Sequence, residues 1–106
     1  TDITFTGCAI HDETEEGQPD LPALLRLNNC KRINITGSQF INGLVGIAAS
    51  NTHHTLISSN TIHDERKKPI AQNGIQFDNT GEGNLAANNS IGPCKSEAIE
   101  GSIHTE

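Results

Sequence analysis

The chain has 106 residues, a length that suits one domain, and its 13 acidic against 7 basic residues give a formal net charge of −6. This charge argues against nucleic acid or an anionic membrane surface as a partner, since both favour Lys and Arg. No apolar run reaches the length of a membrane span. With no Trp, Tyr or Met and only 3 Phe, the chain cannot fill a core with large side chains. Its many Ile, Asn, Thr and Gly suit strands joined by tight turns and nearly exclude a helical bundle.

The first predicted element, residues 2–12 (DITFTGCAIHD), opens a series of similar segments. Each has an apolar or small pair two residues apart, then a turn of Gly, Ser or Asn, then an apolar residue, so short strands and tight turns are expected. The later copies are residues 32–42 (RINITGSQFIN), 54–64 (HTLISSNTIHD) and 83–93 (GNLAANNSIGP). The apolar residues after the turns correspond to one another: Ile10, Phe40, Ile62 and Ile91.

A second series lies between these segments and alternates with them without exception. Its members are residues 24–29 (LLRLNN), 46–51 (GIAASN), 74–79 (GIQFDN) and 98–103 (AIEGSI). The corresponding apolar positions are Leu25, Ile47, Ile75 and Ile99. A solenoid of about four coils explains the alternation, because each strand then pairs in parallel with its equivalent one coil away. Strands stacked about 4.8 Å apart need columns of Ile rather than bulky aromatics, which accounts for the composition.

Asparagines recur at two positions of the repeat. Asn29, Asn51 and Asn79 share one position, and Asn60 and Asn89 share another. Asn tolerates the left-handed conformation of a sharp corner, and stacked side-chain amides can hydrogen-bond along a ladder. These residues are therefore predicted to have a structural role.

The repeat G-I-x-[apolar]-x-N, a variable loop, then [apolar]-x-[apolar]-x-x-N-x-I, is clearest in residues 46–64 and 74–91. It resembles the repeat of right-handed parallel β-helix proteins, the pectin-lyase-like superfold. The resemblance covers essentially the whole chain and implies an all-β fold, with one parallel β-helix domain over residues 1–106. Because a strand already starts at Ile3 and the last aligned positions lie near the end, we expect a helix uncapped at both ends. Such a helix is either a fragment of a longer one or part of an assembly whose coils cap one another.

Enzymes of this class mostly act along the first sheet, which the resemblance assigns to the Gly-Ile strands. Strand alternation turns two columns outward there: Arg26, Ala48, Gln76 and Glu100, and beside them Asn28, Ser50, Asp78 and Ser102. Asp78 and Glu100 have Cα atoms roughly 8 Å apart in this register, so their carboxyl groups can approach to the 5–9 Å that sugar hydrolysis needs. An Arg nearby could bind an acidic sugar. The candidate catalytic residues are Asp78, Glu100 and Arg26, and the candidate substrate-binding residues on this face are Gln76 and Asn28.

The tetrapeptide IHDE occurs twice, at residues 10–13 and 62–65. One interpretation places His63, Asp64 and Glu65 on a groove wall beside Gln76 and Asp78, with His63 and Asp64 as further substrate-binding residues. The other treats His-Asp as a turn choice. The two copies lie two coils apart, roughly 9–10 Å, which is too far for His11 and His63 to share a metal ion.

Other cofactor sites have little support in the sequence. Acidic residues 12–20 (DETEEGQPD) lack the spacing of a calcium loop, so calcium has no support and no metal or other cofactor is predicted. The three cysteines, Cys8, Cys30 and Cys94, form no C-x-x-C pair and are expected to be free thiols.

Two functions stay open. The first is a carbohydrate-active or polysaccharide-binding β-helix, extracellular or periplasmic, acting along the Gly-Ile face; an enzyme of this kind would be a polysaccharide lyase, a glycoside hydrolase or an epimerase. The motifs typical of polygalacturonases, mannuronan epimerases and pectate lyases are missing from this chain. The second is a structural segment of a surface adhesin or tailspike, which the lack of Trp and Tyr favours, since sugars usually stack on these rings. A rod with two open ends is also expected to self-associate, end to end or as another homo-oligomer.

Overall fold

The computed structural model describes residues 2–11, 23–66, 71–78, 81–101 and 104–105. Within these residues the regular structure consists of short β-strands, and no helix occurs. The strands, in chain order, are β1 (Ile3–Thr6), β2 (Ala9–His11), β3 (Leu25–Asn28), β4 (Ile33–Thr36), β5 (Gln39–Ile41), β6 (Val45–Ser50), β7 (Leu56–Ser58), β8 (Thr61–His63), β9 (Asn73–Asp78), β10 (Leu85–Ala87), β11 (Ser90–Ile91), β12 (Ile99–Glu100) and β13 (His104–Thr105).

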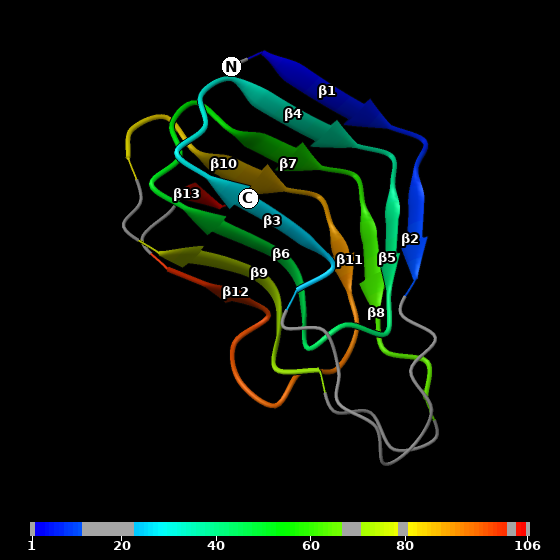
Figure 1. The fold of residues 1–106 in the computed structure, drawn as a ribbon. Helices are drawn as coiled ribbons and strands as arrows, with labels where there is room; N and C mark the ends of the chain where they lie inside the picture. The colour runs from blue at the N-terminus through cyan, green and yellow to red at the C-terminus, as the bar shows by residue number, and fades with distance from the viewer. Residues whose placement is uncertain (1, 12–22, 67–70, 79–80, 102–103, 106) are drawn as a thin grey trace.

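These strands form three sheets, which the chain visits in turn (Figure 1). Sheet A has the order β1-β4-β7-β10-β13, sheet B the order β2-β5-β8-β11, and sheet C the order β3-β6-β9-β12. Every strand pairing within the described residues is parallel. One passage through sheets A, B and C is called a coil here. The predicted all-β architecture of parallel strands is confirmed, and it is compatible with a parallel β-helix.

The register within the sheets agrees with the two predicted columns of apolar residues. In sheet C, Leu25, Ile47, Ile75 and Ile99 are successive partners. In sheet B, the same holds for Ile10, Phe40, Ile62 and Ile91. Ile47 and Ile75 have no exposed surface, and Phe40 is 1% exposed. The core is therefore a stack of apolar layers, mainly aliphatic with Phe40 and Phe77 among them, and the short strands of three sheets surround it.

The glycines of the Gly-Ile motif are required by close packing at the corner between sheets B and C. A Cβ atom on Gly46 would lie 2.6 Å from Ile62 Cγ2 and 2.8 Å from the carbonyl oxygen of Gly74. One coil further, a Cβ atom on Gly74 would lie 2.6 Å from Ile91 Cγ2. The isoleucines of sheet B thus pack directly on bare backbone of sheet C, and no larger residue fits at these two positions.

A ladder of buried amides holds the corner between sheets A and B. The Asn60 Oδ1 atom accepts a hydrogen bond from Ser38 N at 3.0 Å, and its Nδ2 atom donates to the Ile35 carbonyl at 3.0 Å. Asn89 repeats this pattern one coil later, accepting from Asn60 N at 3.0 Å and donating to the Ile57 carbonyl at 3.0 Å. The predicted ladder is confirmed.

The left-handed conformation at this corner lies one residue before the position predicted for it. Ser59 and Asn88 have φ of 58° and 56°, and Gly7 and Gly37 occupy the equivalent places in the first two coils. The asparagines that follow them are not left-handed, because their role is to turn inward and pair buried backbone groups.

At the corner between sheets C and A, the prediction for asparagine is confirmed. Asn29 and Asn51 have φ of 54° and 53°, and Asn51 Nδ2 donates to Asn29 Oδ1 at 2.6 Å. The third member predicted, Asn79, lies outside the described residues. A further buried amide, which the repeat did not indicate, belongs to Asn84: it accepts from Thr55 N at 3.1 Å and donates to the Thr52 carbonyl at 3.0 Å.

The corner glycine gives a first prediction. Gly46→Ala should lower the free energy of unfolding by about 1–3 kcal/mol, because backbone of the next coil must move to admit the methyl group. The matched control is Gly92→Ala, since a Cβ atom there would meet nothing closer than His63 at 3.5 Å. Urea denaturation followed by circular dichroism measures both variants, and equal stability of the two would contradict this explanation of the motif.

The amide ladder gives a second prediction. Asn60→Ala leaves the buried Ser38 amide and the Ile35 carbonyl without a partner and should cost about 2–4 kcal/mol. Asn34→Ala, which removes an exposed amide from the outer face of β4, should change stability little. Thermal melts of the two variants test this, and a melting temperature for Asn60→Ala within a degree or so of the control would argue against the ladder.

Candidate functional site

The outer face of sheet C carries the two columns of side chains expected there, except that Ser102, the last member predicted for the second column, lies outside the described residues. Arg26, Ala48, Gln76 and Glu100 are successive partners, and Asn28, Ser50 and Asp78 form the neighbouring column. Arg26, Asn28, Asp78 and Glu100 are exposed, whereas Ser50 and Gln76 are half-buried. Ala48 is only 7% exposed, so this position contributes little surface, contrary to its expected place in an open polar column. Its methyl group is too short to reach past its neighbours.

Charged side chains distinguish this face from the other two sheets. Arg26, Asp78 and Glu100 are the only Lys, Arg, Asp or Glu residues within the described strands, and all three belong to sheet C. The strands of sheets A and B contribute instead apolar, hydroxyl, amide and imidazole side chains. If a charged ligand is recognised by a sheet face of this molecule, sheet C is the face that can do it.

Asp78 and Glu100 lie near each other in adjacent coils. Glu100 pairs with Gln76, which is two residues before Asp78, so the Cα atoms of the two acids are about 8 Å apart. The Gln76 Nε2 atom donates to Glu100 Oε2 at 3.2 Å. Strand β12 ends directly after Glu100, where Gly101 adopts a φ of 116° beside the Phe77 carbonyl. Gln76, Asp78 and Glu100 therefore form one polar cluster on β9 and β12.

Arg26 and Asn28 lie in the first coil, away from that cluster. Arg26 is three coil steps from Glu100 along its column, a Cα separation of about 14 Å. Asn28 is two steps from Asp78, about 10 Å. Within one copy of the chain, the guanidinium group and the two carboxylates do not form a compact triad.

His63 and Asp64 lie at the opposite end of β9 from Asp78. They follow β8 at the corner that leads into Asn73, and β9 then runs about 16 Å before it reaches Asp78. The expected groove wall beside Asp78 is therefore not assembled. The His63 ring lies instead over Gly92 of the next coil, where a Cβ atom would be 3.5 Å from it.

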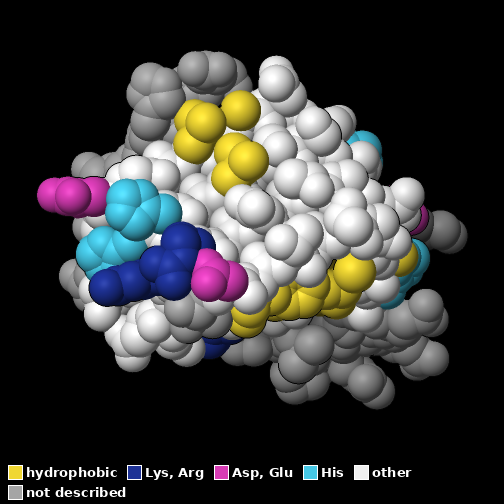
Figure 2. All heavy atoms as spheres, turned by 90° about the horizontal axis from the view of Figure 1, so that it is seen from above, with side chains coloured by type: hydrophobic (Ala, Val, Ile, Leu, Met, Phe, Trp, Pro, Cys, Tyr) yellow, Lys and Arg dark blue, Asp and Glu magenta, His cyan; other side chains and the backbone are white. Residues whose placement is uncertain are grey.

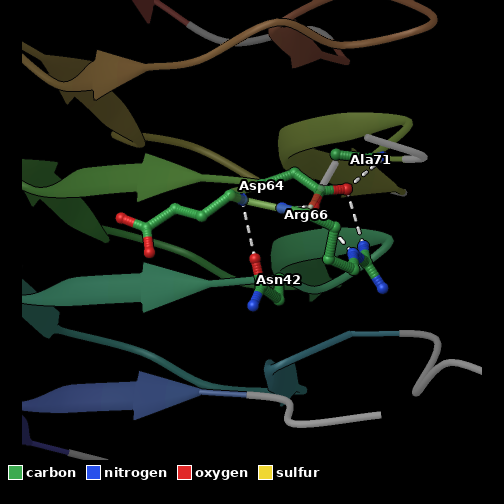
Figure 3. A network of polar contacts seen from close by, with 5 residues as sticks. Asn42, Asp64, Arg66 and Ala71 are labelled. Carbon is green, nitrogen blue, oxygen red and sulfur yellow. Dashed lines mark hydrogen bonds and ion pairs between the residues drawn. The ribbon is translucent and has the colours of Figure 1, made fainter. Parts of the chain in front are cut away.

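The Asp64 side chain is fully buried and anchors the backbone of its own loop (Figure 3). Its oxygens accept hydrogen bonds from Arg66 Nε at 2.7 Å, from the Arg66 terminal nitrogen at 2.6 Å and from Ala71 N at 2.9 Å. Beside it, Asn42 Oδ1 accepts from Glu65 N at 2.7 Å, which ties the loop to the previous coil. A bidentate ion pair whose carboxylate has no exposed surface has a structural role, so the Asp64 carboxylate is not accessible to a ligand on the surface.

A small recess opens beside this anchor, with space for about one water molecule. Its lining includes the side chains of His63, Asp64 and Cys94 together with glycine backbone. Burial raises the pKa of the Cys94 thiol, and a hydrogen bond from the Gly74 backbone offsets part of that rise. The thiol is thus protonated at neutral pH and is a poor nucleophile.

The described residues contain neither a cluster of metal ligands nor a membrane-spanning helix. Within the described ranges, no group of three His, Cys, Asp or Glu side chains could hold a metal ion. The acidic segment 12–20, considered for calcium, lies outside those ranges. The part of the chain that the structure describes also contains no helix that is long and apolar enough to span a membrane. Cys8, Cys30 and Cys94 are half-buried free thiols.

Comparison of this chain with protein-family models, with curated proteins and with solved structures finds no significant match. A function is therefore inferred from the chemistry of the chain's own side chains. The Asp64–Arg66 pair is a further contact that the repeat pattern did not indicate, because both residues lie in a loop whose length varies from coil to coil. An acid two residues before an arginine, directly after a strand, was the local signal for it.

The anchoring role of Asp64 gives a third prediction. Asp64→Asn should cost about 3–5 kcal/mol, because it removes the charge of a fully buried carboxylate that forms a bidentate ion pair with Arg66. Glu65→Gln changes an exposed carboxylate of the same loop and should leave the melting temperature unchanged. Differential scanning calorimetry distinguishes the two. An Asp64→Asn protein that is as stable as Glu65→Gln would contradict the anchoring role of Asp64.

Proposed function

We propose that this chain forms a right-handed parallel β-helix of the pectin-lyase-like class and that it binds or processes a polysaccharide along the outer face of sheet C. The observation that carries the proposal is the confinement of strand charges to this face, in Arg26, Asp78 and Glu100. The outward side chains of a stacked sheet do not pack in the core, so their chemistry is less constrained than that of the inward side chains. Charges gathered on one face of three are therefore available for a ligand.

The Asp78–Glu100 pair has the spacing that glycoside chemistry uses. With Cα atoms about 8 Å apart, rotation of the side chains sets the carboxyl groups within the range over which one acid can protonate a glycosidic oxygen while the other activates water or attacks the sugar. Gln76 orients the carboxylate of Glu100 through its amide. The same constellation suits acid–base chemistry of a lyase or an epimerase, in which one group removes a sugar proton.

The rest of the face supplies polar contacts to a sugar chain. Asn28, Ser50 and Gln76 offer hydrogen-bond donors and acceptors along the columns, and Arg26 offers a cation at the first coil. No aromatic residue contributes a stacking platform among these outward positions. Binding is therefore polar and of modest affinity, and we place the protein outside the cell or in the periplasm, where such polymers occur.

The alternative is a structural segment of a surface adhesin or tailspike without chemistry of its own. One observation favours it: the small recess beside His63 opens at the start of β9, and neither Gln76 nor Asp78 lines it. An enzyme usually surrounds its substrate with concave walls, whereas a structural rod does not need them.

A fourth prediction separates the two functions. Asp78→Asn and Glu100→Gln should each abolish polysaccharide degradation, because each removes one of the two carboxylates, without changing the thermal melt. Glu82→Gln, an exposed acid at the corner before β10, is the matched control and should keep full activity. The assay follows new reducing ends and unsaturated uronates on a panel of neutral and acidic polysaccharides. Blank results for the wild-type chain across the panel and on a glycan array would leave the structural alternative in place.

A further inference from the structure

The corner between sheets C and A contains a left-handed residue before each of β4, β7 and β10. These residues are Arg32, His54 and Gly83, with φ of 58°, 53° and 76°, and the register of sheet A stacks them in one column. Glycine adopts this conformation at no steric cost, and Asn, Asp and His tolerate it better than other residues do. Arg32 is therefore present against the preference of its own backbone, and strain of this kind is often found at functional positions.

Basic side chains gather around Arg32. Lys31 pairs with His53 through a parallel bridge, and the Arg32 amide donates to the His53 carbonyl at 3.0 Å. Lys31, Arg32 and His54 are exposed, and His53 is half-buried. Figure 2 shows His, Lys and Arg side chains together at one edge of the face that it views, where sheet C leads into sheet A, with acidic side chains next to them. In a chain of net charge −6, this corner is a local concentration of cationic groups.

The two imidazole rings both lie on the backbone of the next corner along the stack. A Cβ atom on Gly81 would overlap the His53 ring, and one on Gly83 would overlap the His54 ring. The Glu82 amide donates to Nδ1 of His53 at 3.3 Å, which requires this nitrogen to be unprotonated. A proton there would break the bond, so the pH-dependent charge of the corner is assigned to the exposed His54 ring.

The Arg32 guanidinium already holds a carboxylate. Its Nε and one terminal nitrogen donate to the two oxygens of Asp2, which precedes β1 in the adjacent coil. These hydrogen bonds hold the pKa of the Asp2 carboxyl below its usual range. Both side chains are largely exposed, at 59% for Arg32 and 73% for Asp2, so the pair adds little to stability. It shows instead which chemical group the guanidinium accepts, namely a planar carboxylate bound through both oxygens.

We propose that the corner before β4 is a binding site for carboxylates, with the Arg32 guanidinium as the bidentate donor. Lys31 and the protonated His54 ring supply further positive charge beside it. Asp2 occupies the guanidinium in the free protein, and the ligand displaces it. The ligand is a small organic acid or an acidic side chain of another polypeptide, since both present the two oxygens that Asp2 presents. This site lies away from the outer face of sheet C, so it does not depend on the function proposed above.

Binding at this corner should strengthen as the pH falls from about 7.5 to about 5.5. The charged and titratable groups around His54 are Arg32 and Lys31 on one side and Glu82 on the other, with His53 next to it in the chain. Lys, Arg and Glu side chains ordinarily keep their charge over this range, whereas an exposed imidazole gains a proton around pH 6.5. The added positive charge attracts a carboxylate, which stays ionised.

The test is a titration with succinate at about pH 5.5 and low salt, followed by ¹H–¹⁵N NMR so that the shifted amides locate the site. Arg32→Gly removes the guanidinium and the backbone strain together. It should weaken binding by about tenfold or more without lowering the melting temperature. Lys31→Gln and His54→Gln should each weaken binding about twofold to fivefold. Lys95→Gln, an exposed lysine outside the corner, is the matched control and should keep the wild-type affinity.

A gain of binding is expected when the internal competitor is removed. Asp2→Asn leaves the guanidinium without its carboxylate and should tighten succinate binding about twofold to fivefold. Succinamide, the neutral analogue, should not bind, and a blocked peptide with one Asp, compared with its Asn counterpart, shows whether a polypeptide side chain is accepted as well. Absence of amide shifts at the corner in both the wild type and Asp2→Asn would overturn the proposal. So would an Arg32→Gly protein that melts at a lower temperature and still binds succinate.

Discussion

Parallel pairing of each strand with its equivalent one coil away is the constraint on which this structure depends. It fixes a spacing of about 4.8 Å between equivalent residues, so that every inward position must suit the residue directly above and below it. Isoleucine on isoleucine satisfies this requirement, as Ile47 and Ile75 do with no exposed surface. The same spacing leaves little room for several large aromatic side chains in one column, which agrees with a chain that has 3 Phe and no Trp or Tyr.

The corners are where this constraint is most demanding, because the chain must change direction while keeping its place in the stack. At the corner between sheets B and C, Gly46 and Gly74 have no side chain, and this lets the isoleucines of sheet B pack directly against the backbone. At the corner between sheets A and B, the solution is a buried amide, and Asn60 pairs backbone groups from two coils at once. Glycine thus allows close packing of the backbone at one corner, and asparagine supplies hydrogen bonds to buried backbone groups at another.

Outward positions escape the stacking constraint, and they carry the features from which function is inferred. Among the described strands, charged residues occur on sheet C alone, and Asp78 and Glu100 lie in adjacent coils. Asp64 shows that an acid next to a strand need not face solvent: its carboxylate lies wholly inside a loop and holds Arg66 and the Ala71 amide. The exposed acids Asp78 and Glu100 and the buried acid Asp64 can be told apart only once the path of the loop after Asp64 is known, and that path does not repeat from coil to coil.

The sequence alone determined the parallel all-β architecture, the composition of the columns and the order of residues along sheet C, because the alternation of strands and the coil-length repeat both leave a periodic trace. It also located the corner asparagines. The tertiary structure decided what has no period. In the structure Ala48 is buried, and the left-handed residue at the corner between sheets A and B is Ser59 and not Asn60. His63 is separated from Asp78 by the length of β9, and Asp64 forms an ion pair with Arg66. The physical reason is that stacking repeats a contact in every coil, whereas loop contacts depend on insertions that occur only once.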